Sequence, residues 1–89
     1  MATFGLQLDP SAVRALQRLP EAVAAAVGNF LTGPLAVEPK RVGKPLGGQL
    51  EGYWSARRGA YRVVYAIDDE KTLIRVVRIQ HRADVYRPL

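Results

Sequence analysis

The chain of 89 residues contains no cysteine and only one histidine. Without cysteine it can form no disulfide, no thiolate metal site and no cysteine nucleophile. With a single histidine as well, the usual ligand sets of a structural zinc site are excluded. We therefore expect no metal and no other cofactor.

Long apolar segments are also lacking. The most apolar stretch, residues 22–27, is far shorter than the roughly 20 residues that cross a bilayer. Residues 1–4 carry none of the basic side chains that open a signal peptide. Together with the lack of cysteine, these absences predict a cytoplasmic protein that does not engage membranes.

A chain of this length is expected to form one domain, residues 1–89. Such a domain buries only roughly 60% of its unfolded surface, so an active site should lie on a sheet surface or in a shallow groove. A hydrophobic content of 48% and a charged content of 24% are typical of an ordered globular protein.

Positive charge is concentrated in the second half of the chain. Residues 1–39 carry two basic and three acidic side chains, whereas residues 40–89 carry eleven basic and five acidic ones. Most of the basic residues are arginines, which suit bidentate contacts with phosphate. This asymmetry favours a polyanionic partner over a role in solubility alone.

The first half of the chain predicts a strand and two helices. Residues 3–8 alternate between apolar and polar positions, which indicates a half-buried strand. Asp9 and Pro10 are typical of a helix start, with Asp9 as the N-cap. The expected inward stripe of this first helix is Val13, Leu16 and Leu19. A second helix is expected from Pro20 to Gly33-Pro34, with the inward stripe Val23, Val27, Phe30 and Leu31.

The second half predicts a long loop and three strands. Residues 32–49 are rich in glycine and proline and are expected to form a surface loop. Strands are expected at residues 50–57, 61–67 and 72–80, with a polar turn at residues 68–71. The predicted fold is α+β, in the order β-α-α-β-β-β, with an antiparallel sheet and the two N-terminal helices packed on one face. We expect four aromatic residues to pack in the core or on the sheet rather than to stack on bases: Tyr53, Trp54, Tyr61 and Tyr65.

Four side chains that suit chemistry on RNA are expected at one end of the sheet. In an antiparallel meander, the start of the middle strand lies near the ends of both neighbours. Cleavage of RNA by its own 2′-OH needs proton transfer and positive charge on the phosphate. The converging residues are Arg57, Arg62, His81 and Arg82.

Three segments resemble a known family. They are residues 59–65 (Gly-Ala-Tyr-Arg-Val-Val-Tyr), the acidic turn 68–70, and residues 79–87 (Ile-Gln-His-Arg-Ala-Asp-Val-Tyr-Arg). In this order and spacing they resemble the RelE/ParE superfamily of bacterial toxins, and most closely the RelE-type mRNA interferases of type II toxin–antitoxin systems. Residues 16–20 and 44–46 fit the same pattern.

The resemblance implies an endoribonuclease that cleaves translated mRNA in the ribosomal A site, without metal, through attack of the 2′-OH. It also implies a cognate antitoxin that binds the toxin in a hetero-oligomer such as a heterotetramer. The other implied partners are mRNA and ribosomal RNA.

By position in the motif, the resemblance assigns Arg62 to the scissile phosphate and Arg82 to a second phosphate or acid-assisting contact. Tyr86 matches a tyrosine that orients the 2′-OH or stacks on a base, and His81 matches a histidine that transfers protons. The RelE toxin has two lysines in the strand before this motif, which residues 54–58 lack. Because Arg57 stays protonated, His81 is the candidate base. A backbone hydrogen bond that closes the sheet would explain His81 equally well.

Five basic residues, one of them the converging Arg57, are expected to bind RNA through charge: Arg57, Arg58, Lys44, Arg41 and Arg78. Two other functions stay open. The first is a ParE-type inhibitor of DNA gyrase, which shares the fold and the antitoxin. The second is a basic nucleic-acid-binding module without catalysis.

Overall fold

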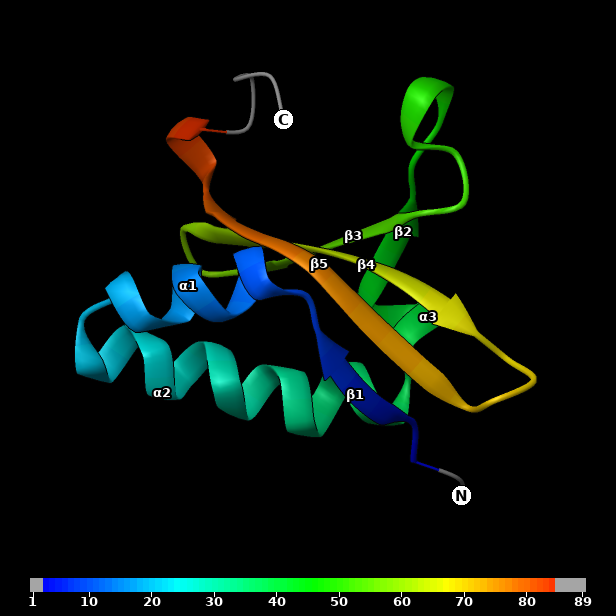
Figure 1. Cartoon of the computed structure of the whole chain (residues 1–89), viewed down its shortest axis with the longest axis horizontal. Coiled ribbons are helices and arrows are strands. Elements are labelled where there is room, and N and C mark those ends of the chain that lie inside the picture. Colours follow the sequence, from blue (N-terminus) through cyan, green and yellow to red (C-terminus); the bar gives the residue numbers. More distant parts are fainter. Residues whose placement is uncertain (1–2, 85–89) are drawn as a thin grey trace.

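The computed structural model describes residues 3–84 of the chain (Figure 1). Within this range no helix is both long enough and apolar enough to cross a membrane. The elements follow one another as β1 (Gly5–Leu8), α1 (Pro10–Arg18), α2 (Glu21–Phe30), a π-helical segment (Leu31–Leu35), α3 (Pro39–Val42), β2 (Gly43–Pro45), a 3₁₀ helix (Gly48–Leu50), β3 (Trp54–Arg58), β4 (Tyr61–Asp68), β5 (Leu73–His81) and a 3₁₀ turn (Arg82–Asp84).

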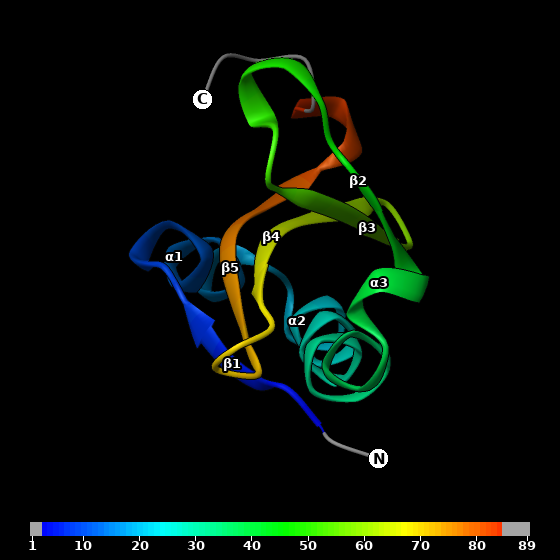
Figure 2. The ribbon, with the colours of Figure 1, turned by 90° about the vertical axis from the view of Figure 1, so that its right-hand side faces the viewer.

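The strands form one sheet in the order β1-β5-β4-β3-β2. Figure 2 shows β1, β5 and β4 following one another from left to right, and the sheet is strongly twisted. The predicted α+β class is confirmed, and Figure 1 shows both long helices on the same side of the sheet. One detail differs, because β1 pairs with β5 in parallel. A hairpin forces neighbouring strands to be antiparallel, but β1 reaches its place beside β5 without one.

The core lies between α2 and every second residue of the central strands. Val63 and Tyr65 of β4 are fully buried and belong to one cluster with Val27, Phe30 and Leu31. The predicted inward stripe of the second helix is therefore confirmed at these three positions. In the first helix Leu16 and Leu19 pack against the core as predicted, whereas Val13 is 40% exposed and Ala12 is fully buried instead.

The prediction that residues 32–49 form a surface loop is wrong. Most of this segment is helical or extended, and Leu35 is fully buried in the core cluster. Pro39 stands in the first turn of α3, where its missing N–H is not needed. The prediction failed because apolar Leu35 and Ala36 occupy core positions, which glycine and proline content alone does not reveal.

Asp9 does not cap α1 with its side chain, contrary to the prediction. Its carboxylate instead accepts hydrogen bonds from Arg75 Nε at 2.9 Å and from Arg75 Nη2 at 3.0 Å. These hydrogen bonds lower the pKa of the Asp9 carboxyl below its ordinary value of 3.8. The chain between β1 and α1 is thereby tied to the middle of β5.

A buried tyrosine holds the short edge strand β2 in place. The Tyr65 hydroxyl donates a hydrogen bond to the Pro39 carbonyl, and burial raises the pKa of Tyr65 to about 12. The hydroxyl fits only because residue 43 is glycine. A Cβ at Gly43 would overlap this hydroxyl and lie 2.9 Å from the Ser55 carbonyl oxygen. The contact therefore joins β4 to α3 and to the start of β2.

We expect Tyr65→Phe to lower the free energy of unfolding by about 1–3 kcal/mol, because the buried Pro39 carbonyl loses its donor. Urea denaturation measures this loss. Tyr53→Phe is the control, since the Tyr53 hydroxyl bonds to no described residue, and it should leave the midpoint unchanged. Equal midpoints for Tyr65→Phe and wild type would contradict the role given to this bond.

A second expectation concerns acid. The pKa of Asp9 is depressed in the folded state, so the Asp9–Arg75 pair stabilises the fold above pH 3.8 and loses this effect as the pH falls below it. Asp9→Asn should therefore be less stable than wild type at neutral pH, and the difference should shrink in acid. The midpoint of thermal unfolding, measured between pH 7 and pH 3, shows this difference. Glu51→Gln is the control, because it also removes one carboxylate. A difference that does not vary with pH would contradict the assignment.

Candidate functional site

The side of the sheet turned away from α1 and α2 is called here the open face. On β4, Arg62, Val64 and Ala66 alternate with the core residues Val63 and Tyr65, so their side chains belong to the open face, where Val64 is itself buried. Residues paired across strands share a side of the sheet. The register therefore adds Arg57 and Ser55 from β3, Lys44 from β2, and Gln80, Arg78 and Arg75 from β5.

A bulge in β5 decides which side Arg78 occupies. Val64 pairs with Arg78 and the next residue, Tyr65, pairs with Val76, so Val77 is an extra residue in β5. Strict alternation from Val76, which is fully buried, would have turned Arg78 toward the core. The bulge is held by α1, because Ser11 Oγ donates a hydrogen bond to the Val77 carbonyl at 2.7 Å.

Arg57 and Arg62 lie directly opposite each other on the open face. Like charges at such a position destabilise a sheet. Among the described residues, the ion pairs are Lys40–Asp69, Arg41–Glu38 and Arg75–Asp9, so none neutralises this arginine pair. The arrangement is unfavourable for folding alone, and an anion bound between the two side chains would relieve it.

Arg62 is more buried than Arg57, the arginine opposite it. Its Nε is buried without a hydrogen-bond partner in the described part of the chain. Arg57 and Gln80 flank it on the two adjacent strands. Arg78 Nη1 donates a hydrogen bond to Gln80 Oε1 at 3.3 Å, so Gln80 is also oriented. These side chains form a row across three strands with Arg62 at its centre.

The four residues predicted to converge do lie at one end of the sheet. Their side chains, however, are divided between the two faces of the sheet. Arg57, Arg62, His81 and Arg82 all lie at the end of the sheet beside the β3–β4 turn, where the Arg82 N–H donates to the Ala60 carbonyl at 2.7 Å. Arg62 pairs with Gln80, whereas Tyr61 pairs with His81. His81 therefore lies on the helix side with Tyr61. Their rings pack edge to face, with the ring centroids 5.2 Å apart.

One nitrogen of His81 is already engaged. Its Nδ1 accepts a hydrogen bond from the Ala83 N–H at 3.1 Å, which is the sheet-closing contact considered from the sequence. The other ring nitrogen, Nε2, is left for any proton transfer.

The remaining predicted residues are dispersed. Arg58 pairs with Tyr61 and belongs to the helix side, opposite to Arg57. Arg41 lies on α3, where Glu38 neutralises it at 3.2 Å. Arg82 is exposed at the start of the 3₁₀ turn. Tyr86 lies outside the described residues.

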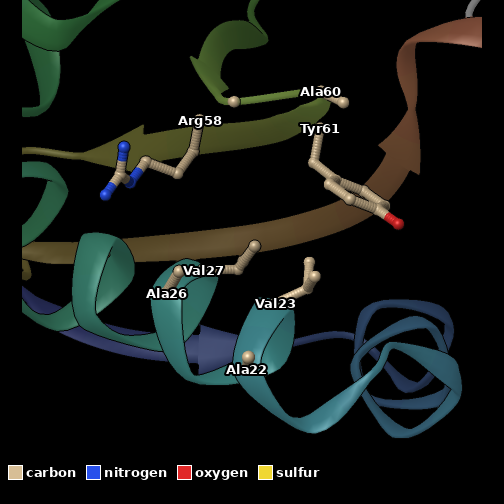
Figure 3. A pocket seen from close by; sticks show the side chains of 8 residues that line it. Ala22, Val23, Ala26, Val27, Arg58, Ala60 and Tyr61 are labelled. Atoms are coloured by element: carbon tan, nitrogen blue, oxygen red, sulfur yellow. The ribbon is translucent and has the colours of Figure 1, made fainter.

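An apolar groove lies on the helix side. It has a volume of about 360 Å³ between α2 and the β3–β4 turn. Figure 3 shows Val23 and Val27 projecting from α2 toward the strand that carries Tyr61. Of the described residues that line it, Arg58 is the one that carries a charge. The two sides of the sheet thus differ in chemistry, with cations on the open face and an apolar groove on the other.

The sequence prediction missed Gln80, Ser55 and Arg75 as members of the open face. A signal for the bulge was present, because the buried residues Ile74, Val76 and Ile79 are spaced by two and then by three. An extra residue is the simplest way to keep all three on one side.

The fold and the open face define a small α+β protein with an arginine-lined sheet. The profile of the family described as "ParE toxin of type II toxin-antitoxin system, parDE" matches residues 6–86. The chain therefore belongs to this family of toxins, within the RelE/ParE superfamily that its motifs resemble.

Two relatives from Mycobacterium tuberculosis are similar over almost their whole length. Toxin RelG is 49% identical over 84 residues, which is 94% of this chain and 97% of the relative. Toxin RelE is 50% identical over 84 residues, which is 94% of this chain and 87% of the relative.

Solved structures agree with the fold. The toxin–antitoxin complex RelBE2 of the same organism contains a chain with a TM-score of 0.87 and 46% identity, covering 91% of this chain and 100% of that one. The isolated Escherichia coli RelE toxin has a TM-score of 0.71 at 23% identity, covering 90% and 84%. At that identity the second likeness shows the fold alone.

We expect Arg57→Thr to raise the free energy of unfolding by about 0.5 kcal/mol, because it removes a like charge opposite Arg62. Urea denaturation at low ionic strength measures the gain, which salt should diminish. Arg58→Thr, on the same strand but facing the other side, should give no such gain. If Arg57→Thr destabilises the protein, the two arginines do not repel each other as the register implies.

Proposed function

We propose that this protein is a ribosome-dependent endoribonuclease that cleaves translated mRNA in the A site through attack of the 2′-OH. The Arg57–Arg62 pair carries the proposal, because two arginines that form no ion pair with any described residue lie opposite each other on the open face. Such a pair suits a phosphate whose oxygens gain negative charge during cleavage. Family membership and relatives named RelG and RelE support the same class of toxin.

In this proposal Arg62 binds the scissile phosphate. Its side chain is partly buried between the neighbouring strands, so part of its conformational freedom is already lost before RNA binds. Arg57 and Arg78 bind the same or adjacent phosphates from either side, and Lys44 adds charge from the edge strand. Arg82 contacts a phosphate at the strand end or assists the leaving 5′-oxygen.

Proton transfer is assigned to His81 through Nε2, with Tyr86 orienting the 2′-OH. Since the His81 ring lies on the helix side, RNA must pass around the end of β5 to reach both His81 and Arg62. His81 also holds the Ala83 N–H, and through it the segment that carries Arg82.

A cognate antitoxin is the proposed protein partner, bound in a hetero-oligomer. Solved structures related to this chain include toxin–antitoxin complexes. The groove between α2 and Tyr61 offers an apolar surface, and Arg58 at its lining would favour a segment that also carries acidic residues. Its occupant would be amphipathic and negatively charged.

Inhibition of DNA gyrase is the second candidate, and the ParE description of the matching family favours it. The two candidates differ in their target. Cleaved DNA trapped on gyrase by the purified protein, with intact mRNA in a translation reaction, would replace the nuclease proposal.

The decisive experiment maps mRNA 5′ ends in a reconstituted translation reaction. Wild-type protein should cut the message within codons only when ribosomes are present. Arg62→Ala should slow cutting by about 100-fold or more, because it removes the central phosphate contact. Arg14→Ala, an exposed arginine on α1, is the control and should cut like wild type. Undiminished cutting by Arg62→Ala would overturn the assignment.

A further inference from the structure

Tyr53 stands apart from the other aromatic residues of the sheet. Trp54, Tyr61 and Tyr65 all belong to or pack against the buried cluster, as the sequence predicted. Tyr53 is only half-buried and is not among the described residues of that cluster. The core therefore does not account for its ring.

The register places Tyr53 on the open face. Trp54 pairs with Tyr65, and both face the core. Continuing this register by one position sets Tyr53 opposite Ala66. On the other side of Ala66, β5 contributes Arg75. Because alanine is small, the Tyr53 ring can extend over it toward Arg75.

The charges agree with this geometry. Asp9 raises the pKa of Arg75 first through its hydrogen bonds and then through its charge, and Tyr53 lies near enough to add the smallest effect in the same direction. Arg75 binds the Asp9 carboxylate through Nε and Nη2. The Tyr53 phenol, by contrast, forms no hydrogen bond to a described residue.

The backbone around Tyr53 is fixed by hydrogen bonds. Its N–H donates to the Leu50 carbonyl at 3.0 Å, and its carbonyl accepts from the Leu46 N–H at 2.8 Å. Gly52, which precedes it, has a φ of +95°, a backbone conformation that residues other than glycine rarely adopt. The ring is thus presented from an ordered turn. In Figures 1 and 2 this hairpin, residues 46–53, rises from the sheet on the side opposite to the helices.

We propose that Tyr53 is a stacking platform for one base of the single-stranded RNA whose phosphates lie on Arg57, Arg62 and Arg78. This rests on the proposed RNA substrate and adds a base subsite to it. Tyr53 and Ser55 point to the same side, about 7 Å apart along β3, and Arg57 follows at about 13 Å. A nucleotide adjacent to the bound phosphates therefore brings its base over the ring.

Stacking of this kind tolerates any base, since each base presents a π-face. The subsite would hold the RNA strand in line across β3, β4 and β5 and leave the reading of its sequence to other contacts. The cations attract the RNA phosphates, and this part of the affinity falls as the salt concentration rises. The part of the affinity that comes from Tyr53 should not depend on salt.

Binding of two short RNAs tests the proposal. One is a single-stranded oligonucleotide with 2-aminopurine at successive positions, and the other has the same length and backbone with abasic sites there. Tyr53→Leu should bind the first about tenfold more weakly than wild type, whereas Tyr53→Phe should bind it like wild type. Wild type and Tyr53→Leu should bind the abasic RNA equally. Wild type and Tyr53→Phe should quench the fluorescence of 2-aminopurine, and Tyr53→Leu should not.

The outcomes separate this subsite from the phosphate site. Arg62→Ala should weaken the binding of both RNAs equally, because Arg62 contacts the RNA phosphate backbone. If Arg62→Ala has no effect while Tyr53→Leu discriminates between the RNAs, the phosphate assignment fails and the stacking platform stands. Equal binding of the base-containing RNA by wild type and Tyr53→Leu overturns the platform, and so does an equal loss with both RNAs. Unfolding midpoints of Tyr53→Leu and Tyr53→Phe show whether each variant keeps its fold.

Discussion

The register of β4 between β3 and β5 is the constraint on which the rest of this molecule depends. One side of β4 must bury Val63 and Tyr65 against α2, and period-two alternation then commits Arg62 to the other side. A slip of one residue would bury that arginine and expose both core residues. The hydrophobic effect in the core therefore sets the position of the charged surface.

The same alternation separates two chemistries on one thin sheet. Arg57 and Arg58 are neighbours in sequence, yet one faces the arginine-lined open face and the other lines the apolar groove beside α2. A polyanion and an amphipathic protein segment could thus be bound from opposite sides. Charge repulsion between Arg57 and Arg62 weakens the sheet slightly, and burial on the helix side offsets it.

Long-range contacts complete the open face at both edges. The Tyr65 hydroxyl reaches Pro39 and allows β2 to add Lys44 at one edge. At the other, Ser11 holds the bulge that turns Arg78 outward. Neither contact involves residues that are near in sequence, because each joins an N-terminal or central segment to a strand of the closing hairpins.

Local pattern was enough to determine the α+β class, the buried stripe Val27 and Phe30 on α2 with Leu31 directly after it, and the strands that carry Arg57, Arg62 and Arg78. These follow from short-range periodicity and from turn residues, which act over a few positions. Tertiary structure alone decided that β1 runs parallel to β5, that Asp9 binds Arg75 instead of capping α1, and that residues 32–49 contribute to the core and the sheet. It also decided that His81 and Arg62 face different sides and that Tyr53 stays out of the core. Each of these depends on a pairing partner distant in sequence, and a single inserted residue such as Val77 reverses the side on which every later side chain of its strand emerges.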